Sequence, residues 1–90
     1  MSVDTIRAIK FKKYVLSLDL QCREVFLKSC IECVTENTPL YLWLLNLLII
    51  MEGDETKGEK KGATLDYNLW KDLFSIHYDN PEFQEIADRI

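Results

Sequence analysis

An almost uninterrupted apolar segment, residues 40–51, most constrains what this 90-residue chain can fold into. Its sequence is Leu-Tyr-Leu-Trp-Leu-Leu-Asn-Leu-Leu-Ile-Ile-Met, in which Asn46 is the one polar residue. A helix needs about 20 apolar residues to span a bilayer, and a strand is usually about 5–6 residues long, so the segment fits neither. A helix that is apolar all round must be covered on every side. We therefore expect the central helix of a small bundle or part of a subunit interface.

Residues that typically begin and end helices flank this segment. Thr38 is a good N-cap, and Pro39 suits the first helical position because it has no amide hydrogen to leave unpaired. Gly53 stands shortly after the last apolar residue, where a glycine in the left-handed conformation commonly ends a helix. The sequence therefore predicts a helix over 39–52.

Apolar spacing predicts three more helices, over 20–36, over 64–78 and from Pro81 onward. The first places on one broad face Cys22, Val25, Phe26, Cys30, Cys33 and either Ile31 or Val34. The second carries a stripe of Leu65, Leu69, Leu73 and Ile76, flanked by Trp70, Phe74 and His77. Asn80-Pro81 repeats the cap-and-proline signal, and the last helix is expected to bury Phe83, Ile86, Ala87 and Ile90.

The N-terminal segment is ambiguous between helix and strand. Ser2 is a possible helix cap, yet Ile9–Lys12 and Leu16–Leu20 alternate with the period of two that is typical of strands. The expected fold is a small all-α bundle of four to five helices, with an α+β fold that has a strand at about 9–20 as the alternative. Residues 1–90 are expected to form a single helical domain with a flexible, charged loop at 53–63, which holds all three glycines.

Composition and cysteine content point to a globular protein in a reducing compartment. The hydrophobic fraction of 48% and charged fraction of 29% are typical of globular chains. The three cysteines are odd in number and lie in predicted helices, and no apolar region follows a basic N-terminal flank as in a signal peptide. These features favour reduced thiols and a cytoplasmic location.

Few residues suggest catalysis or metal binding. Cys30-Ile-Glu-Cys33 has the C-x-x-C spacing of redox centres, but such centres sit at helix N-termini, whereas this pair is expected near the end of a helix. A zinc site needs two further ligands, and Cys22 and His77 do not have the spacing of a zinc finger. No nucleophile elbow, P-loop or dinucleotide fingerprint accompanies the single histidine. We therefore expect buried structural thiols, no metal, no cofactor and no enzymatic activity.

The net charge of −4 is unevenly distributed along the chain. Residues 1–50 carry six Lys or Arg and five Asp or Glu, whereas residues 51–90 carry five and ten. An acidic half repels phosphate backbones and attracts basic surfaces. Aromatic anchors with a charged rim are typical of protein interfaces. The candidate partner-binding residues are Asp66, Tyr67, Asp72, Tyr78, Asp79 and Glu82.

The leading hypothesis is a small acidic module that inhibits or regulates a basic macromolecular partner, such as a toxin or a nucleic-acid-processing enzyme. Immunity proteins and phage-encoded inhibitors act in this manner. One alternative is a structural or regulatory subunit that self-associates, for example as a homodimer, through residues 40–51. A second alternative is a nucleic-acid-binding regulator that uses the N-terminal cations Arg7, Lys10, Lys12 and Lys13. The acidic balance argues against nucleic acid, and no feature indicates a membrane partner. In the simplest interpretation, Trp70 and Phe74 are core residues and the acidic residues only keep the protein soluble.

Overall fold

The chain folds as a bundle of helices. The computed structural model describes the backbone of residues 3–57 and 62–90 and the side chains of residues 3–51 and 67–90. The elements are α1 (Val3–Ser17), α2 (Leu20–Glu32), α3 (Pro39–Lys57), α4 (Gly62–Asp72), the π-helical turn η1 (Leu73–His77) and α5 (Pro81–Asp88). No strand occurs within these ranges, which confirms the all-α prediction. The alternative strand at about 9–20 is wrong, because those residues lie in α1 and at the start of α2.

Helix α1 buries one narrow stripe, which explains why a helix forms despite the alternating sequence. Ala8, Phe11 and Val15 are fully buried and follow one another at spacings of three and four residues. Val3 and Ile6, in contrast, are exposed. The helical period of these buried residues therefore prevails over the local period of two.

Helix α2 is shorter than predicted and presents a different face to the core. The Asp19 side chain caps it by accepting from the Cys22 amide at 2.8 Å, and the helix ends at Glu32 rather than at residue 36. Its buried side chains are Leu27 and Cys30. The predicted face is wrong at three positions, since the exposed side chains include Cys22, Val25 and Cys33.

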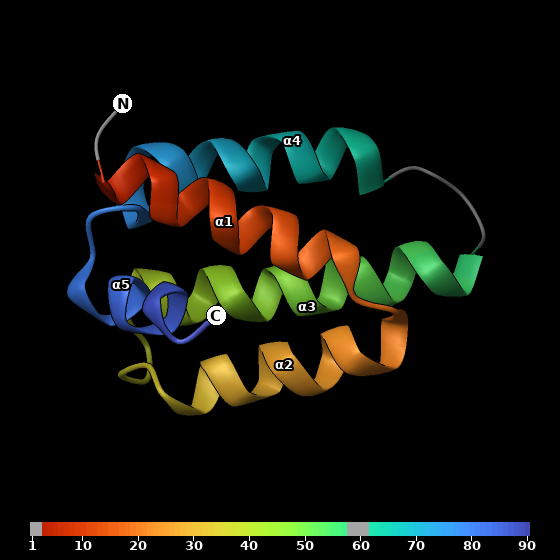
Figure 1. The fold of residues 1–90 in the computed structure, drawn as a ribbon. Helices are drawn as coiled ribbons and strands as arrows, with labels where there is room; N and C mark the ends of the chain where they lie inside the picture. Colours follow the sequence, from red (N-terminus) through yellow and green to blue (C-terminus); the bar gives the residue numbers. More distant parts are fainter. Residues whose placement is uncertain (1–2, 58–61) are drawn as a thin grey trace.

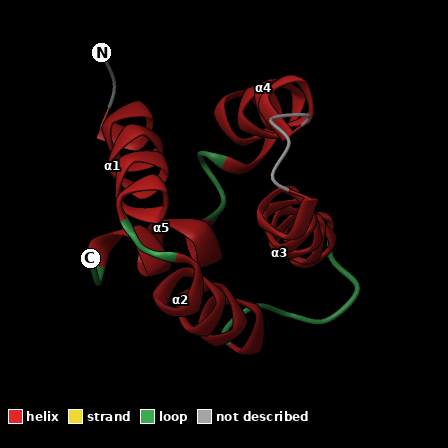
Figure 2. Cartoon of the chain, turned by 90° about the vertical axis from the view of Figure 1, so that its right-hand side faces the viewer, coloured by secondary structure: helices red, strands yellow, loops and turns green. Residues whose placement is uncertain are grey.

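Helix α3 packs between α2 and α4, as Figure 2 shows in a view along the bundle. Its start is confirmed, because the Thr38 hydroxyl accepts from the Tyr41 amide at 3.3 Å. The rest of the chain does not cover every side of this helix: Leu44 is fully buried, but Leu42 is 51% and Ile49 63% exposed. Two neighbouring helices do not surround α3 completely, so one stripe of the apolar run faces solvent. No helix within the described ranges is both long and apolar enough to cross a membrane.

Helix α3 also continues past the predicted stop. It ends at Lys57 and includes Gly53, so that glycine is a helical residue and not a left-handed cap. Helix α4 begins at Gly62, and the part of the predicted loop between them, residues 58–61, lies outside the described residues. The flexibility of the loop at 53–63 therefore stays a prediction.

Aromatic side chains from four helices meet at the centre of the bundle. The Phe11 ring centroid lies 5.2 Å from that of Phe83, 5.9 Å from that of Phe26 and 6.0 Å from that of Trp43. These contacts join α1, α2, α3 and α5, and α5 lies at the end of the bundle where α3 begins (Figure 1). The radius of gyration of 12.4 Å is close to the roughly 12 Å expected for a compact chain of this length.

The π-helical turn changes which residues of the 64–78 segment face the core. Leu69 and Leu73 are buried as predicted, but Ile76 is 57% exposed and His77 is buried in its place. A π-helix bonds residues five apart and so turns the following side chains away from their α-helical directions. Leu65 lies outside the described side chains.

The last helix largely follows its prediction. The Asn80 side chain accepts from the Glu82 amide at 2.9 Å, which confirms the predicted cap. Phe83, Ile86 and Ala87 are buried, whereas Ile90 follows the end of α5 and is exposed.

Candidate functional site

The carboxylates of the described side chains fall into two groups. One group makes hydrogen bonds or ion pairs inside the protein, and its members are Asp4, Asp19, Glu24, Glu82, Glu85 and Asp88. Asp72 and Asp79, in contrast, are exposed and make no hydrogen bond or ion pair within the part of the chain that the structure describes, and the same holds for Glu32 and Glu36. Only the second group is fully available to another molecule.

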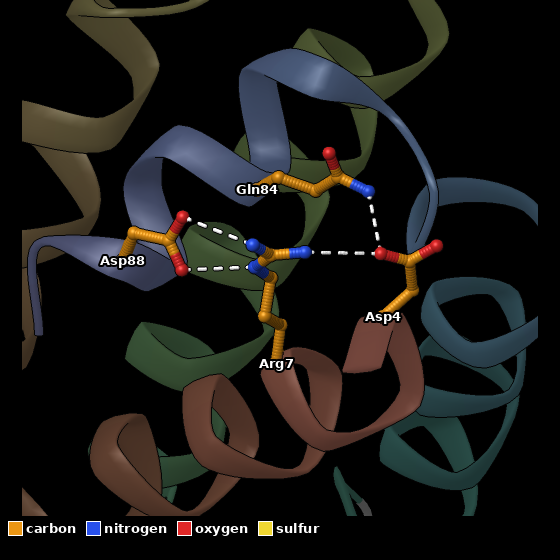
Figure 3. A network of polar contacts seen from close by, with 4 residues as sticks. All are labelled: Asp4, Arg7, Gln84 and Asp88. Carbon is orange, nitrogen blue, oxygen red and sulfur yellow. Dashed lines mark hydrogen bonds and ion pairs between the residues drawn. The ribbon is translucent and has the colours of Figure 1, made fainter. Parts of the chain in front are cut away.

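A polar network around Arg7 uses two of the internally bonded carboxylates (Figure 3). The Arg7 guanidinium donates to Asp88 through Nε at 2.8 Å and Nη2 at 3.3 Å, and to Asp4 through Nη1 at 3.0 Å. Gln84 Nε2 donates to the same Asp4 oxygen at 2.7 Å. The hydrogen bond from Arg7 holds the pKa of Asp88 below its usual value. This network ties α1 to α5, so its charges serve the fold.

Glu82 fastens the α2–α3 connection to the start of α5. Its Oε2 accepts from both the backbone amide and the hydroxyl of Thr35, each at 3.0 Å. The connection also contains Asn37, whose φ of 65° lies in the left-handed region that asparagine tolerates well. The α2–α3 and η1–α5 connections therefore meet at one end of the bundle (Figure 1). Glu36, which follows Thr35 in the sequence, and Asp79 are both exposed at this end of the bundle.

Four of the six predicted partner-binding residues lie in two regions. Tyr67, at 70% exposure, and Asp72 project from α4, while Asp79 and Glu82 lie at the end of the bundle described above. Tyr78 is half-buried and packs against the core. The side chain of Asp66 lies outside the described residues. Sequence reasoning missed Glu36, because it considered acidic residues of the C-terminal half alone.

His77 is the one buried polar side chain in the part of the chain that the structure describes. Its ring centroid lies 5.6 Å from that of Trp43, whose indole Nε1 donates to the Leu69 carbonyl oxygen at 2.9 Å. Burial lowers the pKa of His77, and the nearby Asp72 charge partly opposes this effect. The Ser75 hydroxyl donates to the Lys71 carbonyl oxygen at 2.8 Å, so it does not form a nucleophile–base pair with the histidine.

The basic N-terminal cluster is partly engaged in internal contacts. Arg7 is held by two carboxylates, and Lys12 Nζ lies 5.6 Å from the centroid of the Trp70 ring. That distance is typical of a cation–π contact. Lys10 and Lys13 remain the exposed cations of this cluster.

No group of three His, Cys, Asp or Glu side chains within residues 3–51 and 67–90 is arranged as ligands of a metal ion. The chain matches no protein-family model, and comparisons with curated proteins and with solved structures give no significant similarity. Function therefore has to be inferred from the side chains and their surroundings.

Proposed function

We propose that the protein binds a basic macromolecular partner through acidic residues of its C-terminal half and thereby inhibits or regulates that partner. The observation that carries the proposal is the contrast among the carboxylates. In the C-terminal half, Asp72 and Asp79 are exposed and unpaired among the described residues, as Glu32 and Glu36 are in the N-terminal half, while six other carboxylates are bonded internally. Because Asp72 and Asp79 are unpaired among the described residues, no internal hydrogen bond or ion pair has to break when a partner binds them. Their negative charge also attracts a positively charged surface.

Tyr67 supplies the aromatic contact that such an interface needs. Its side chain is 70% exposed on α4, the helix that also carries Asp72. Tyrosine contributes a large contact area at low entropic cost and is enriched among the residues that dominate binding energies. We therefore place Tyr67 and Asp72 in one contact region, and Asp79 and Glu36, which lie at the same end of the bundle, in a second.

The nature of the partner follows from charge complementarity. A toxin or nucleic-acid-processing enzyme carries a basic surface for its own substrate, and an acidic module that occupies this surface blocks it. The proposal resembles the action of immunity proteins and phage-encoded inhibitors in style, and it locates the protein in the cytoplasm, where three free thiols stay reduced. It includes no catalytic role.

The test compares two double variants with the same change in net charge. Asp72→Lys/Asp79→Lys reverses the unpaired carboxylates of the predicted surface, while Glu24→Lys/Glu85→Lys reverses two that lie outside it. Wild type, variant and control are immobilised and exposed to an extract of the source cells, and retained proteins are identified by mass spectrometry at low and high salt. We expect wild type and control to retain the same basic protein and the first variant to lose it. Equal retention by all three proteins would contradict the proposal.

Self-association through α3 is the second candidate, and a specific observation favours it. Leu42 and Ile49 are exposed on the helix, with half-buried Leu45 and exposed Asn46 between them at helical spacing. The stripe carries no charge, and an apolar residue stands at each of its ends. Two antiparallel copies of α3 could therefore present the same pattern to each other in an isologous contact. Light scattering tests this directly: a homodimer that dissociates in Leu42→Ser/Ile49→Ser supports it, and a monomeric wild type contradicts it.

Nucleic-acid binding through the N-terminal cluster is the third candidate. The internal contacts of Arg7 and Lys12 leave Lys10 and Lys13 to meet phosphates, which is a small number for a sequence-independent contact. Filter binding of labelled DNA and RNA at low salt, with Lys10→Glu/Lys13→Glu as the comparison, separates this candidate from the others.

A further inference from the structure

The three thiols of the protein lie in three different environments. Cys22 and Cys33 are exposed, whereas Cys30 is buried. The exposed pair differ in the charge beside them: the neighbour of Cys22 is the carboxylate of Asp19, and the neighbour of Cys33 is the guanidinium of Arg89. Cys22 therefore serves as an internal reference for the reactivity of Cys33.

Arg89 contacts the sulfur of Cys33 directly. Its Nη1 donates to Cys33 Sγ at 3.5 Å, while its Nη2 is held by Glu85 Oε1 at 2.8 Å. Reactive cysteines occur in electropositive, solvent-accessible surroundings, and Cys33 has both features. Glu85 orients the guanidinium, so the cation is positioned by a second residue of α5.

The other two thiols lack this support. The Asp19 carboxylate beside Cys22 raises the pKa of that thiol, because a negative neighbour disfavours a thiolate. Burial raises the pKa of Cys30 to about 12. Both effects disfavour the thiolate, and Cys30 is also shielded from reagents.

Cys30 and Cys33 are close enough to react with each other. They lie three positions apart at the last turn of α2, and helical geometry places such Cα atoms about 5 Å apart, within the 4.4–6.8 Å range of disulfides. Both border one small cavity of about 60 Å³, which Arg89 also lines. Cys33 is the C-cap of the helix, where backbone movement toward a disulfide disturbs few other bonds.

We propose that Cys33 is a peroxide-reactive thiol and that Cys30 is its resolving partner. The Cys33 thiolate attacks one oxygen of hydrogen peroxide, the O–O bond breaks, and the departing hydroxide takes up a proton as water. Cys33 is thereby oxidised by two electrons to a sulfenic acid, and the peroxide is reduced. The sulfur of Cys30 then loses its proton and attacks the Cys33 sulfur, the S–O bond breaks, and a second water leaves as the disulfide forms.

Trypsin separates the relevant cysteines, which makes the site of oxidation measurable. Cleavage after Lys and Arg leaves Cys30 and Cys33 together in fragment 29–57 and Cys22 in fragment 14–23. The protein is treated with limiting hydrogen peroxide, blocked with N-ethylmaleimide and digested for mass spectrometry. We expect fragment 29–57 to lose two hydrogens and to carry no maleimide, while fragment 14–23 is fully alkylated. Oxidation of Cys22 at an equal rate, or an unoxidised 29–57, would overturn the proposal.

Two variants on α5 separate the effect of the cation from a general change in structure. Arg89→Met removes the guanidinium and should slow iodoacetamide alkylation of Cys33 several-fold, whereas Glu85→Gln keeps the guanidinium and should leave Cys33 at least as reactive. The alkylation rate of Cys22 serves as the internal reference and should be the same in all proteins. A wild-type rate at Cys33 in Arg89→Met would overturn the role of the cation.

Cys30→Ser tests the resolving step. In this variant the oxidation of Cys33 should stop at the sulfenic acid, which dimedone traps in fragment 29–57. The wild type under the same conditions should give little dimedone adduct, because Cys30 consumes the sulfenic acid. Equal adduct in both proteins would show that Cys30 does not resolve Cys33.

Discussion

The imidazole of His77 packs against the indole of Trp43, with ring centroids 5.6 Å apart and ring planes inclined by 48°. Trp43 is fixed by its hydrogen bond to Leu69 and by a second, edge-on ring contact with Trp70 at 5.8 Å. His77 therefore lies against a fixed indole ring where α3, α4 and η1 meet. The folded state accommodates the neutral imidazole better than the charged one, because burial lowers the pKa of His77.

The first prediction is a loss of stability on mild acidification. The pKa of His77 is lowered in the folded state relative to its ordinary value of 6.5, so the unfolded state binds the proton more readily. The free energy of unfolding should thus be constant above the unfolded pKa and decrease as the pH falls below it toward the folded pKa. Urea unfolding followed by tryptophan fluorescence at about pH 8 and about pH 5 measures this difference.

The control for this prediction removes the titrating group and keeps an aromatic ring. His77→Phe cannot be protonated, so its stability should change much less between the two pH values than that of the wild type. Asp72, whose charge favours protonated His77, provides a second control. The Asp72→Asn variant should lose more stability than the wild type between the two pH values. A wild type that is equally stable at both pH values would show that the burial of His77 has no energetic consequence.

The second prediction uses two leucines of α3 that lie two residues apart. Leu44 is fully buried and Leu42 is 51% exposed. Leu44→Asp should prevent folding, because an unpaired buried charge costs several kcal/mol against a total stability of about 5–15 kcal/mol. Leu42→Asp should stay within about 0.5 kcal/mol of the wild type, as most surface substitutions do. Circular dichroism and thermal melting distinguish them, and two variants with the same melting temperature would contradict the orientation of α3.

How far the sequence predicts this fold depends on whether the determining contacts are local. The caps at Thr38 and Asn80 are local hydrogen bonds, and both were predictable from residue type and spacing. The burial of His77 in place of Ile76 was not predictable. It follows from a π-helical turn, which an α-helical wheel with 100° per residue does not represent. The exposed stripe of α3 was also unpredictable, since hydrophobicity alone does not reveal how many helices cover the apolar run.

The candidate sites show the same limit. The exposure of Asp72 and Asp79 was predictable, because both lie outside the apolar stripes of their segments. The contact of Glu82 with Thr35 spans 47 residues of sequence and that of Arg89 with Cys33 spans 56, so no local pattern reveals either. The expectation of buried thiols is therefore wrong for Cys22 and Cys33, which are exposed, and the charge beside each sulfur became visible only in the folded chain.

The third prediction tests where α3 ends. Gly53 lies inside this helix, and a glycine in a helix interior costs up to about 1 kcal/mol relative to alanine. Gly53→Ala should therefore raise the free energy of unfolding by up to about that amount. If Gly53 were a left-handed cap, the same substitution would be destabilising, because alanine avoids positive φ. Chemical denaturation gives the sign, and Asn46→Ala on the exposed side of the same helix controls for general helix propensity.

The last prediction separates a structural carboxylate from an available one at the same end of the bundle. Glu82 accepts two hydrogen bonds from Thr35 and lies in the first turn of α5, whereas Asp79 is exposed and unpaired among the described residues. Glu82→Ala should lower the free energy of unfolding by about 1–2 kcal/mol, because it removes bonds to a charged acceptor and a favourable interaction with the helix dipole. Asp79→Ala should change it by less than about 0.5 kcal/mol.

A double-variant cycle identifies the contact responsible for this difference. Thr35→Val removes the hydroxyl donor, so its cost should be smaller in the Glu82→Ala background than in the wild type. Asp79→Ala combined with Thr35→Val should instead be additive, since no contact joins these two residues within the described part of the chain. Additive costs for Thr35 and Glu82 would show that the hydroxyl bond between them contributes nothing to stability. The backbone amide of residue 35 would then remain as the donor that holds Glu82.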